Sequence, residues 1–495
     1  MHPLIEEVAA AQEPELLAEQ LRGEPGIVLL RSALFDSPQA RYSFVTARPF
    51  LVFRSYGSRC ELSSATGSQI QFGNPWRLLE SLMPRYELLD ELDSPFPLGG
   101  CFGYWGYDLK NFVEPRLPRR APNDLELPDC NVGFYDSLVV FDHRLGKSWI
   151  ISTGLGVDGS RSDLQAKKKL GYWHARLDRA SPQHYHPTGF EDRERLSSAR
   201  REFAKPPDST ASRVRSDLSR PEFLDRVARA QAFIRAGDIY QVNLSQRLAA
   251  PWALSGWELF QHLTAASPAP FSAYLDCGEF QIVSSSPELF LRLSGAHIQT
   301  RPIKGTRPRS SDPTRDAQLT YELQTSPKEM AELLMITDLL RNDLGKVSEF
   351  GSVQVPELVR LERYPQVQHL VSTVEGRLRR ELSHFAALAS CFPGGSITGA
   401  PKFRAMEIID ELETVSRGPY TGALGYLGFN RESQLSIAIR SAVCKQGQAY
   451  FHAGAGIVAD SLATAEYEET LAKASGFFAA LRLAAPTEIE ALSTA

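Results

Sequence analysis

The chain has 495 residues, 43% hydrophobic and 23% charged, which is typical of a globular protein large enough for two domains. Its formal net charge of −5 argues against a nucleic acid or an anionic membrane as partner and favours a small-molecule task. The N-terminus lacks the pattern of a signal peptide, and no run of about 18 apolar residues occurs, so we expect a cytoplasmic protein without membrane segments. The six cysteines have no C-x-x-C spacing, which indicates reduced, buried thiols.

Residues 1–155 have the pattern of a strand-rich half. The predicted elements in chain order are a helix at 14–22, strands at 26–30, 41–45 and 51–53, a helix starting at Trp76, a sharply bent strand at 97–108, and a hairpin formed by 132–142 and 148–153. Residues 156–218 are polar and interrupted by prolines, which predicts a connecting arm with one helix at 161–179.

Residues 219–485 form the second half, which alternates helices and strands. The predicted elements are a helix capped by Ser219, strands at 238–247, 272–275, 280–284 and 289–293, a helical region at 314–344, a helix at 402–412, and strands at 436–441 and 452–458.

The stretch Arg301–Arg309 holds a lysine between residues of opposite backbone character. Pro302 fixes φ and Gly305 relaxes it, so Lys304 is predicted to lie in a tight, stiffened turn. A lysine among arginines in a turn is usually part of a solvated basic loop, and this segment alone does not decide between the two interpretations.

Carboxylates occur in two patterns that suit catalysis. Glu288 directly follows a predicted strand, where it is either an exposed loop acid or a proton donor beside a cleft. Glu329 with Glu332, and Glu466 with Glu469, are three residues apart and share a helix face. Two such helices can clamp a hard cation, with Mg²⁺ the natural candidate, although solvated helix surfaces carry the same spacing.

Glycine loops and basic groups suggest carboxylate binding. The loop 392–402 lacks a Gly-Lys-Ser/Thr ending, so nucleotide binding is rejected, but its amides and hydroxyls suit a carboxylate. Arg440 offers a guanidinium fork, and a strand with Gly454 and Gly456 permits close backbone approach. A structural ion pair is the alternative for Arg440.

Taken together, the motifs resemble those of the chorismate-utilising enzymes, the family of the anthranilate, aminodeoxychorismate, isochorismate and salicylate synthases. The segments that carry the resemblance are 238–244, 285–288, 302–306, 331–343, 367–372, 395–402, 439–441, 454–456 and 467–470. The resemblance implies an α/β fold, a large two-sheet sandwich with helices outside and the active site in the second half. Residues 29–32 and 41–44 resemble the family's effector pocket, so Ser32, Tyr42, Ser43 and Phe44 form a candidate tryptophan pocket.

Within the family, Lys304 points to the aminodeoxychorismate branch, because anthranilate synthases resemble P-I-A-G-T at this segment. Residues 269–274 also resemble that branch, and isochorismate-forming relatives carry a lysine where this chain has Gln241. The implied activity is amination of chorismate for 4-aminobenzoate and folate synthesis, with ammonia from a glutamine amidotransferase subunit. An anthranilate-forming enzyme and a catalytically silent tryptophan-binding subunit are the alternatives.

The resemblance also implies a role for each site residue. Lys304 is the covalent nucleophile and Glu288 the general acid. Magnesium is held mainly by Glu332 and Glu469, with Glu329 and Glu466 on the same faces. The residues implied in substrate binding are Arg440, Gly454, Gly456, Ser396, His369, Thr306 and Lys473.

Overall fold

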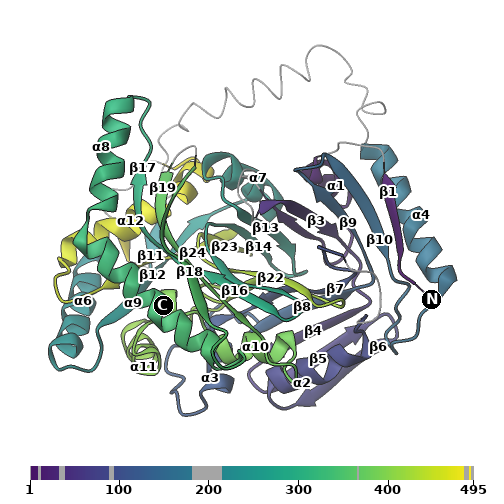
Figure 1. Ribbon diagram of the computed structural model, residues 1–495, viewed down its shortest axis with the longest axis horizontal. Helices are drawn as coiled ribbons and strands as arrows, with labels where there is room; N and C mark the ends of the chain where they lie inside the picture. Colours follow the sequence, from purple (N-terminus) through teal and green to yellow (C-terminus); the bar gives the residue numbers. More distant parts are fainter. Residues whose placement is uncertain are drawn as a thin grey trace.

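The computed structural model describes residues 2–8, 13–32, 40–88, 94–180, 214–364, 367–483 and 490–491. Two large sheets run through these residues, and the helices pack around them (Figure 1). The expected α/β sandwich with helices outside is therefore confirmed. Among the helices of the described ranges, none is long and apolar enough to cross a membrane.

The first sheet contains strands from both halves of the chain. Its order is β1 (Leu4–Val8), β10 (Lys147–Ser152), β9 (Ser137–Asp142), β3 (Tyr42–Thr46), β2 (Val28–Arg31), β13 (Phe271–Asp276), β14 (Gln281–Ser286), β23 (Ser441–Lys445), β24 (Gln448–Ile457), β12 (Gln241–Pro251), β11 (Arg215–Ser216) and β25 (Glu490–Ala491), with β20 (Gly399–Ala400) also on β12. The halves meet where β2 pairs with β13, with Leu29 opposite Tyr274. Neighbouring strands are antiparallel except β11 and β25.

The second sheet also joins the two halves. Its order is β17 (Ile303–Pro308), β19 (Val367–Arg377), β16 (His297–Arg301), β15 (Leu289–Ser294), β22 (Glu432–Ile437), β21 (Ala423–Gly428), β7 (Gly100–Trp105), β8 (Cys130–Tyr135), β4 (Leu51–Tyr56), β5 (Arg59–Ser64) and β6 (Gly67–Phe72), with β18 (Gln354–Arg363) on the other side of β19. Where β7 pairs with β21, Gly103 lies opposite Gly425. A Cβ on Gly103 would lie 2.2 Å from the Asn131 carbonyl oxygen, so this backbone contact requires glycine.

The helices lie around the sheets. They are α1 (Pro14–Gln20), α2 (Pro75–Leu82), α3 (Lys110–Val113), α4 (Asp163–Ala180), α6 (Arg220–Arg235), α7 (Gly256–Ala266), α8 (Pro313–Gln324), α9 (Pro327–Gly345), α10 (His384–Cys391), α11 (Lys402–Leu412) and α12 (Ala463–Ala480). Figure 1 shows α1 and α4 at the N-terminal end and α6, α8, α9, α11 and α12 at the opposite end. The predicted cap is present, because Ser219 and Glu222 form a capping box at the start of α6.

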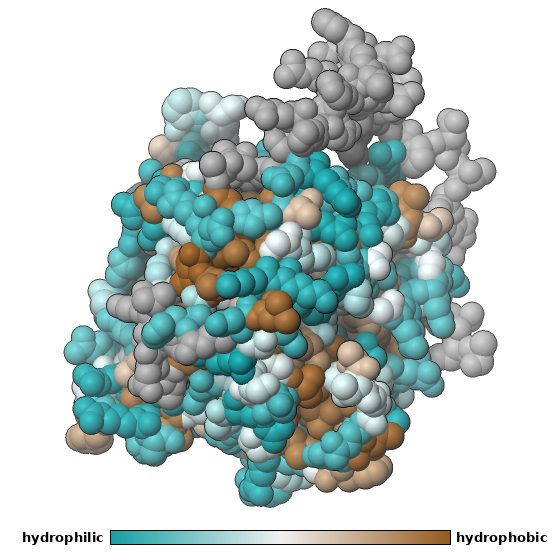
Figure 2. Space-filling view, turned by 90° about the vertical axis from the view of Figure 1, so that its right-hand side faces the viewer, coloured by the Kyte–Doolittle hydropathy of each residue, from teal (hydrophilic) through white to brown (hydrophobic). Residues whose placement is uncertain are grey.

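Among the described residues, four apolar clusters hold these layers together, the smallest formed by Leu323, Leu333 and Leu370. The largest lies between the sheets and contains side chains of both halves, such as Phe134 and Phe290. A second cluster packs α4, α7 and α12 on the first sheet through Trp173, Trp257 and Phe477. A third cluster lies beneath α6 and α11. On the face shown in Figure 2, hydrophobic residues form only small groups separated by hydrophilic ones.

The connecting arm is described only in part. The helix predicted at 161–179 is confirmed as α4, and β11 at the end of the arm pairs with β12. The rest of the arm, residues 181–213, lies outside the described residues. Each sheet joins one block of strands from before the arm to one block from after it, at the pairings of β2 with β13 and of β7 with β21, and the largest apolar cluster draws on both blocks. Residues 1–155 and 219–485 therefore share one core.

Three local predictions were wrong. Residues 132–142 do not form one strand, because the chain leaves the second sheet after β8 and enters the first at β9. Lys304 lies in strand β17 rather than in a turn, and Gly305, at φ +71°, forms an irregularity in the pairing with β19. Arg440 lies between β22 and β23, at φ +49°, rather than within a strand.

Candidate active site

Two places where the chain passes from one sheet to the other position the acid and a cation. Glu288 lies between β14 of the first sheet and β15 of the second, and Arg440 lies between β22 and β23. The two crossings are hydrogen-bonded to each other. The Ile437 amide donates to the Glu288 carbonyl at 3.1 Å, and the Ser285 amide donates to the Arg440 carbonyl at 3.0 Å. Glu288 and Arg440 are therefore fixed at the gap between the sheets.

A cavity of about 720 Å³ lies at this gap. This volume is within the range of roughly 300 to 1,000 Å³ that is usual for small-molecule sites. The sequence-predicted residues that line it are Glu288, Lys304, Thr306, Glu329, Glu332, His369, Ser396, Arg440, Gly454, Gly456, Glu469 and Lys473. Segments far apart in the sequence are thus brought together around one space.

The carboxyl group of Glu288 is buried and held by one hydroxyl. The side chain is 6% exposed, and Ser396 Oγ donates a hydrogen bond to Oε1 at 2.5 Å. Burial raises the pKa of Glu288 to about 7, although the Ser396 hydrogen bond and the charges of Lys304 and Lys473 oppose the rise. A carboxyl group with this pKa can deliver or accept a proton near neutral pH.

The amine of Lys304 enters the cavity beside a carboxylate. Its Nζ lies 3.7 Å from Oε2 of Glu332, which is on α9. The flanking arginines are held by other acids: Arg301 pairs with Glu362 at 2.6 Å, and Arg307 with Glu329 at 3.3 Å. Arg307 and Glu329 line the cavity as an ion pair, whereas Arg301 does not line it, and Lys304 brings a primary amine to the same space.

The carboxylates of α9 and α12 do not form a four-membered clamp. Glu332 and Glu469 both line the cavity, but Glu466 accepts a hydrogen bond from Ser461 Oγ at 2.6 Å. Burial raises the pKa of Glu466. Burial acts in the same direction on Glu469, but the positive charges of Lys473, Lys328 and Lys304 outweigh it, so the pKa of Glu469 is lowered.

The donor set fits a hard divalent cation in its chemistry. Mg²⁺ typically uses one or two carboxylates and keeps several waters, and Glu332 and Glu469 supply carboxylate oxygens from two helices. Within the described ranges, no three His, Cys, Asp or Glu side chains gather closely enough to hold a metal ion. A bound Mg²⁺ would therefore complete its shell with water and ligand oxygens.

Among the residues that the structure describes, Arg440 has no acidic partner. Burial lowers the pKa of its guanidinium, and no carboxylate in the described part of the chain lies within ion-pair distance. The structural ion pair weighed as the alternative is thus absent among these residues. An unpaired, largely desolvated guanidinium beside a cavity is suited to bind a carboxylate of a ligand.

Gly454 and Gly456 lie on β24, where they pair with Ser245 and Asn243 of β12, and side chains approach both. A Cβ on Gly456 would lie 2.4 Å from Gln241 Nε2, and one on Gly454 would lie 3.0 Å from the Tyr420 hydroxyl. The Gly454 carbonyl accepts a hydrogen bond from Lys473 Nζ at 2.9 Å. The space beside these glycines, which was expected to admit a ligand, is therefore partly occupied by the protein's own polar groups.

His369 on β19 is paired with Thr306 on β17. The two side chains are 2.8 Å apart, from Thr306 Oγ1 to His369 Nδ1. Burial and the charge of Arg440 lower the pKa of His369 to about 4, so the ring is neutral at physiological pH. The pair joins the two strands at the wall of the cavity.

Sequence reasoning missed several residues of the cavity wall. Arg417, Tyr420 and His452 line it, and the buried Arg417 pairs with Glu413 at 2.6 Å. Arg417 also donates to the Ile397 carbonyl at 3.2 Å and so holds the loop that carries Ser396. A single arginine in a loop forms no recognisable sequence motif. The burial of Arg417 would have marked it as a site residue, but burial cannot be read from the sequence.

The candidate tryptophan pocket is narrow in the described residues. Ser32, Tyr42 and Phe44 line a hollow of about 30 Å³. That volume holds about two water-sized molecules, so an indole would require the walls to move apart. Ser43 does not line the hollow, and its hydroxyl accepts a hydrogen bond from the Ser32 amide at 2.9 Å.

Comparisons with known proteins show the family of this chain. A profile of the family described as chorismate binding enzyme matches residues 31–479. The chain is 38% identical over 484 residues to anthranilate synthase component 1 of Acetivibrio thermocellus, covering 97% of this chain and 95% of that protein. It is 39% identical over 454 residues to aminodeoxychorismate synthase component 1 of Klebsiella aerogenes, covering 92% and 93%.

A solved structure shares the fold. The crystal structure of anthranilate synthase component I from Streptococcus pneumoniae TIGR4 superposes with a TM-score of 0.74 at 30% sequence identity, covering 89% of this chain and 93% of that one. Relatives named anthranilate synthase and relatives named aminodeoxychorismate synthase are thus nearly equal in sequence identity to this chain.

Proposed function

Because this chain belongs to the chorismate-binding enzymes, we propose that it is an aminodeoxychorismate synthase that replaces the C4 hydroxyl of chorismate with ammonia. The observation that carries this proposal is the amine of Lys304, which lines the same cavity as the buried acid Glu288. The product, 4-amino-4-deoxychorismate, would serve 4-aminobenzoate and folate synthesis.

In the proposed first step, the Lys304 amine forms a bond to C2 of chorismate. The two ring double bonds shift, the C4–oxygen bond breaks, and Glu288 gives its proton to the departing hydroxyl, which leaves as water. In the second step, ammonia bonds to C4, the double bonds shift back, and the C2–nitrogen bond to Lys304 breaks. The lysine nitrogen keeps both of its protons in the adduct and is positively charged there, so it leaves as a neutral amine. The Glu288 carboxylate takes the proton that the new ammonium group at C4 loses.

The remaining residues orient the substrate. Arg440 would bind the enolpyruvyl carboxylate, and Glu332 and Glu469 would hold Mg²⁺, which stabilises the charge of the ring carboxylate when bound. Ser396 holds the Glu288 carboxyl group, and the neutral His369 with Thr306 shapes the wall near Lys304.

An anthranilate-forming enzyme is the second candidate, because relatives with that name are as similar as those of the amination branch. Product analysis separates the two. With chorismate, Mg²⁺ and ammonium, we expect 4-amino-4-deoxychorismate without release of pyruvate. Anthranilate together with an equal amount of pyruvate would instead establish the second candidate. Any turnover of chorismate excludes a silent regulatory subunit.

The covalent step has its own test. Protein incubated with chorismate and Mg²⁺ but without ammonia should gain the mass of chorismate less one water, and Lys304→Ala should not. Lys328→Ala is a matched control, because Lys328 also lines the cavity, and it should retain the adduct. No adduct in the unmodified protein, or one that persists in Lys304→Ala, contradicts covalent catalysis.

A glutamine amidotransferase subunit is the proposed source of ammonia. The motifs of the chain account for chorismate chemistry, and the names of the relatives describe component 1 of a synthase. Addition of the cognate amidotransferase should allow glutamine to replace ammonium in product formation. No gain of glutamine-dependent activity with a co-purifying subunit would refute this partner.

A further inference from the structure

The loop that carries Ser396 is anchored at its entry by one ammonium group. Lys402, which directly follows this glycine loop, does not line the cavity. Its Nζ donates instead to Asp343 Oδ2 at 2.5 Å and to the carbonyl oxygens of Cys391 and Pro393 at 3.2 and 2.9 Å. An ammonium group has three N–H donors, so all three are used within the protein.

The anchor is buried and joins two helices. Lys402 begins α11, whereas Asp343 lies in the last turn of α9, and their side chains are 13% and 1% exposed. Solvent screens such a pair only weakly, so it restrains both of its ends. Helix α9 also carries Glu332, which lines the cavity. The entry of the loop is therefore fixed relative to a helix of the active site.

Two glycines separate the anchored residue from Ser396. Gly394 and Gly395 follow Pro393 directly, and glycine restricts the backbone less than any other residue. A Cβ on Gly395 would lie 2.6 Å from Leu339 Cδ2, so the backbone of the loop lies against α9. Without a fixed Pro393, the two glycines would allow Ser396 to change its direction.

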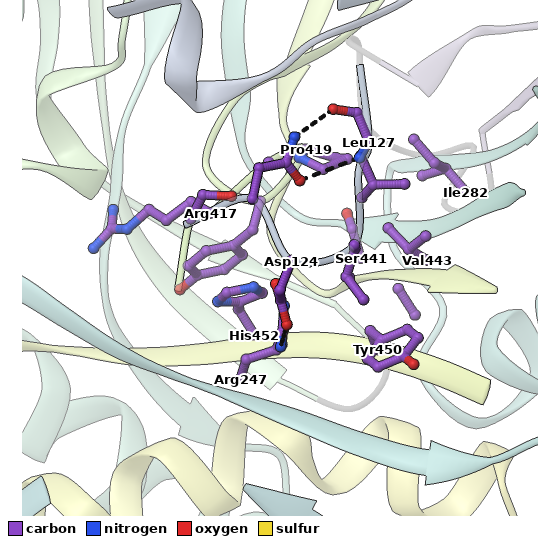
Figure 3. A pocket seen from close by; sticks show the side chains of 16 residues that line it. Asp124, Leu127, Arg247, Ile282, Arg417, Pro419, Ser441, Val443, Tyr450 and His452 are labelled. Atoms are coloured by element: carbon purple, nitrogen blue, oxygen red, sulfur yellow. Dashed lines mark hydrogen bonds and ion pairs between the residues drawn. The ribbon is translucent and has the colours of Figure 1, made fainter. Parts of the chain in front are cut away.

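The exit of the loop is held separately. Asn243 Nδ2 on β12 donates to the Ser396 carbonyl at 3.1 Å, and Arg417 donates to the Ile397 carbonyl at 3.2 Å. Figure 3 shows the side chain of Arg417 at a second, small pocket, which shares this residue with the cavity. Both contacts bind main-chain oxygens, so the direction of the Ser396 hydroxyl also depends on how the chain enters the loop.

We propose that Lys402 and Asp343 are positioning residues for the acid: by fixing the entry of the loop, they hold the Ser396 hydroxyl on Glu288. The inference rests on the proposed function, in which Glu288 is the proton donor. It adds two residues that act on the reaction through Ser396, although neither of them lines the cavity.

The pH dependence of the reaction reports the position of the Ser396 hydroxyl. Burial raises the pKa of Glu288, and the Ser396 hydrogen bond and the charges of Lys304 on β17 and Lys473 on α12 lower it. If the hydroxyl moves away, the pKa rises, and the decline of kcat/KM for chorismate moves to higher pH. A partly folded variant lowers the height of this profile but not the pH of its decline. The readout therefore separates positioning from stability.

Lys402→Met is measured from pH 6 to 9 at a fixed concentration of free ammonia. We expect the decline to move to higher pH by about 0.5–1 unit, which corresponds to the loss of one hydrogen bond. Asp343→Asn weakens the same anchor without a change in size, should move the decline in the same direction, and decides the question if Lys402→Met does not fold. Lys346→Met is the matched control, because it removes the exposed partner of Asp343 and should leave the decline in place.

The double variant Lys402→Met/Ser396→Ala tests the route of the effect. Its decline should lie where it lies in Ser396→Ala alone, because two changes that act through one contact are not additive. Additive shifts, or an unchanged decline in a folded anchor variant while Ser396→Ala moves it, overturn the proposal and leave the anchor a structural one. Absence of 4-amino-4-deoxychorismate from the unmodified protein with ammonium would instead refute the proposed function.

Discussion

At the scale of single residues, the acid Glu288 sets the expected pH dependence. Its pKa of about 7 results from burial, and only the protonated form can give a proton to the leaving hydroxyl. At a fixed concentration of free ammonia, kcat/KM for chorismate should therefore decline as pH rises above about 7. Glu288→Gln should lose this activity at all pH values. Rates measured from pH 6 to 9 check the prediction.

Ser396→Ala provides the control for this assignment. The hydrogen bond from Ser396 lowers the pKa of Glu288, so its loss should move the decline to higher pH. A decline that keeps its position in Ser396→Ala would assign the titration to another group.

The variant Arg440→Gln tests whether Arg440 binds the ligand or stabilises the fold. A hydrogen bond to a charged group contributes about 1.5–3 kcal/mol, so Arg440→Gln should lower kcat/KM for chorismate by about 10- to 150-fold. The free energy of unfolding without ligand should not fall, because the guanidinium has no acidic partner in the described residues. Urea denaturation and steady-state kinetics measure the two effects. A loss of stability larger than about 1 kcal/mol would indicate a structural role.

At the scale of elements, Lys402, whose side chain is 13% exposed, ties the Ser396 loop to α9. Its Nζ donates to Asp343 Oδ2 at 2.5 Å and to the carbonyl oxygens of Cys391 and Pro393 at 3.2 and 2.9 Å. Lys402→Met leaves the buried Asp343 carboxylate with only the exposed Lys346 as a cationic partner. The variant should therefore lose about 3–5 kcal/mol of unfolding free energy. Chemical denaturation checks this value.

Lys346 is the matched control for this tie. It pairs with the other oxygen of Asp343 at 3.0 Å, but its side chain is 49% exposed. Lys346→Met should cost less than about 1 kcal/mol, since solvent screens an exposed pair. Equal costs for both variants would show that burial of the Lys402 pair contributes nothing.

The elements also show how far the sequence could predict the site. Helical spacing correctly placed Glu329 and Glu332 on one face of α9, because that pattern is local. It also placed Glu466 beside Glu469, but the contact with Ser461 turns Glu466 elsewhere, and no local pattern shows this. Arg440 and the segment 132–142 were mistaken for parts of strands, because the points where the chain changes sheets depend on pairing with distant strands.

At the scale of the whole molecule, both sheets contain strands from before and after the connecting arm. β2 pairs with β13, and β7 pairs with β21, so each half supplies neighbours that the other requires. The largest apolar cluster lies between the sheets and also draws on both halves. Glu288 and Arg440 lie at crossings between these sheets, so the integrity of the site follows from the shared core.

This shared core predicts one cooperative unfolding transition. Trp105 is buried in the largest apolar cluster and Trp173 in the second cluster, so tryptophan fluorescence reports loss of packing across the molecule. In urea, fluorescence and ammonium-dependent activity should fall with the same midpoint, as two-state unfolding requires. Residues 219–485 expressed alone should not fold, because β13 would lose β2, β21 would lose β7, and apolar surface would be exposed. Two separate transitions, or a folded and active 219–485 fragment, would show that the halves are independent domains.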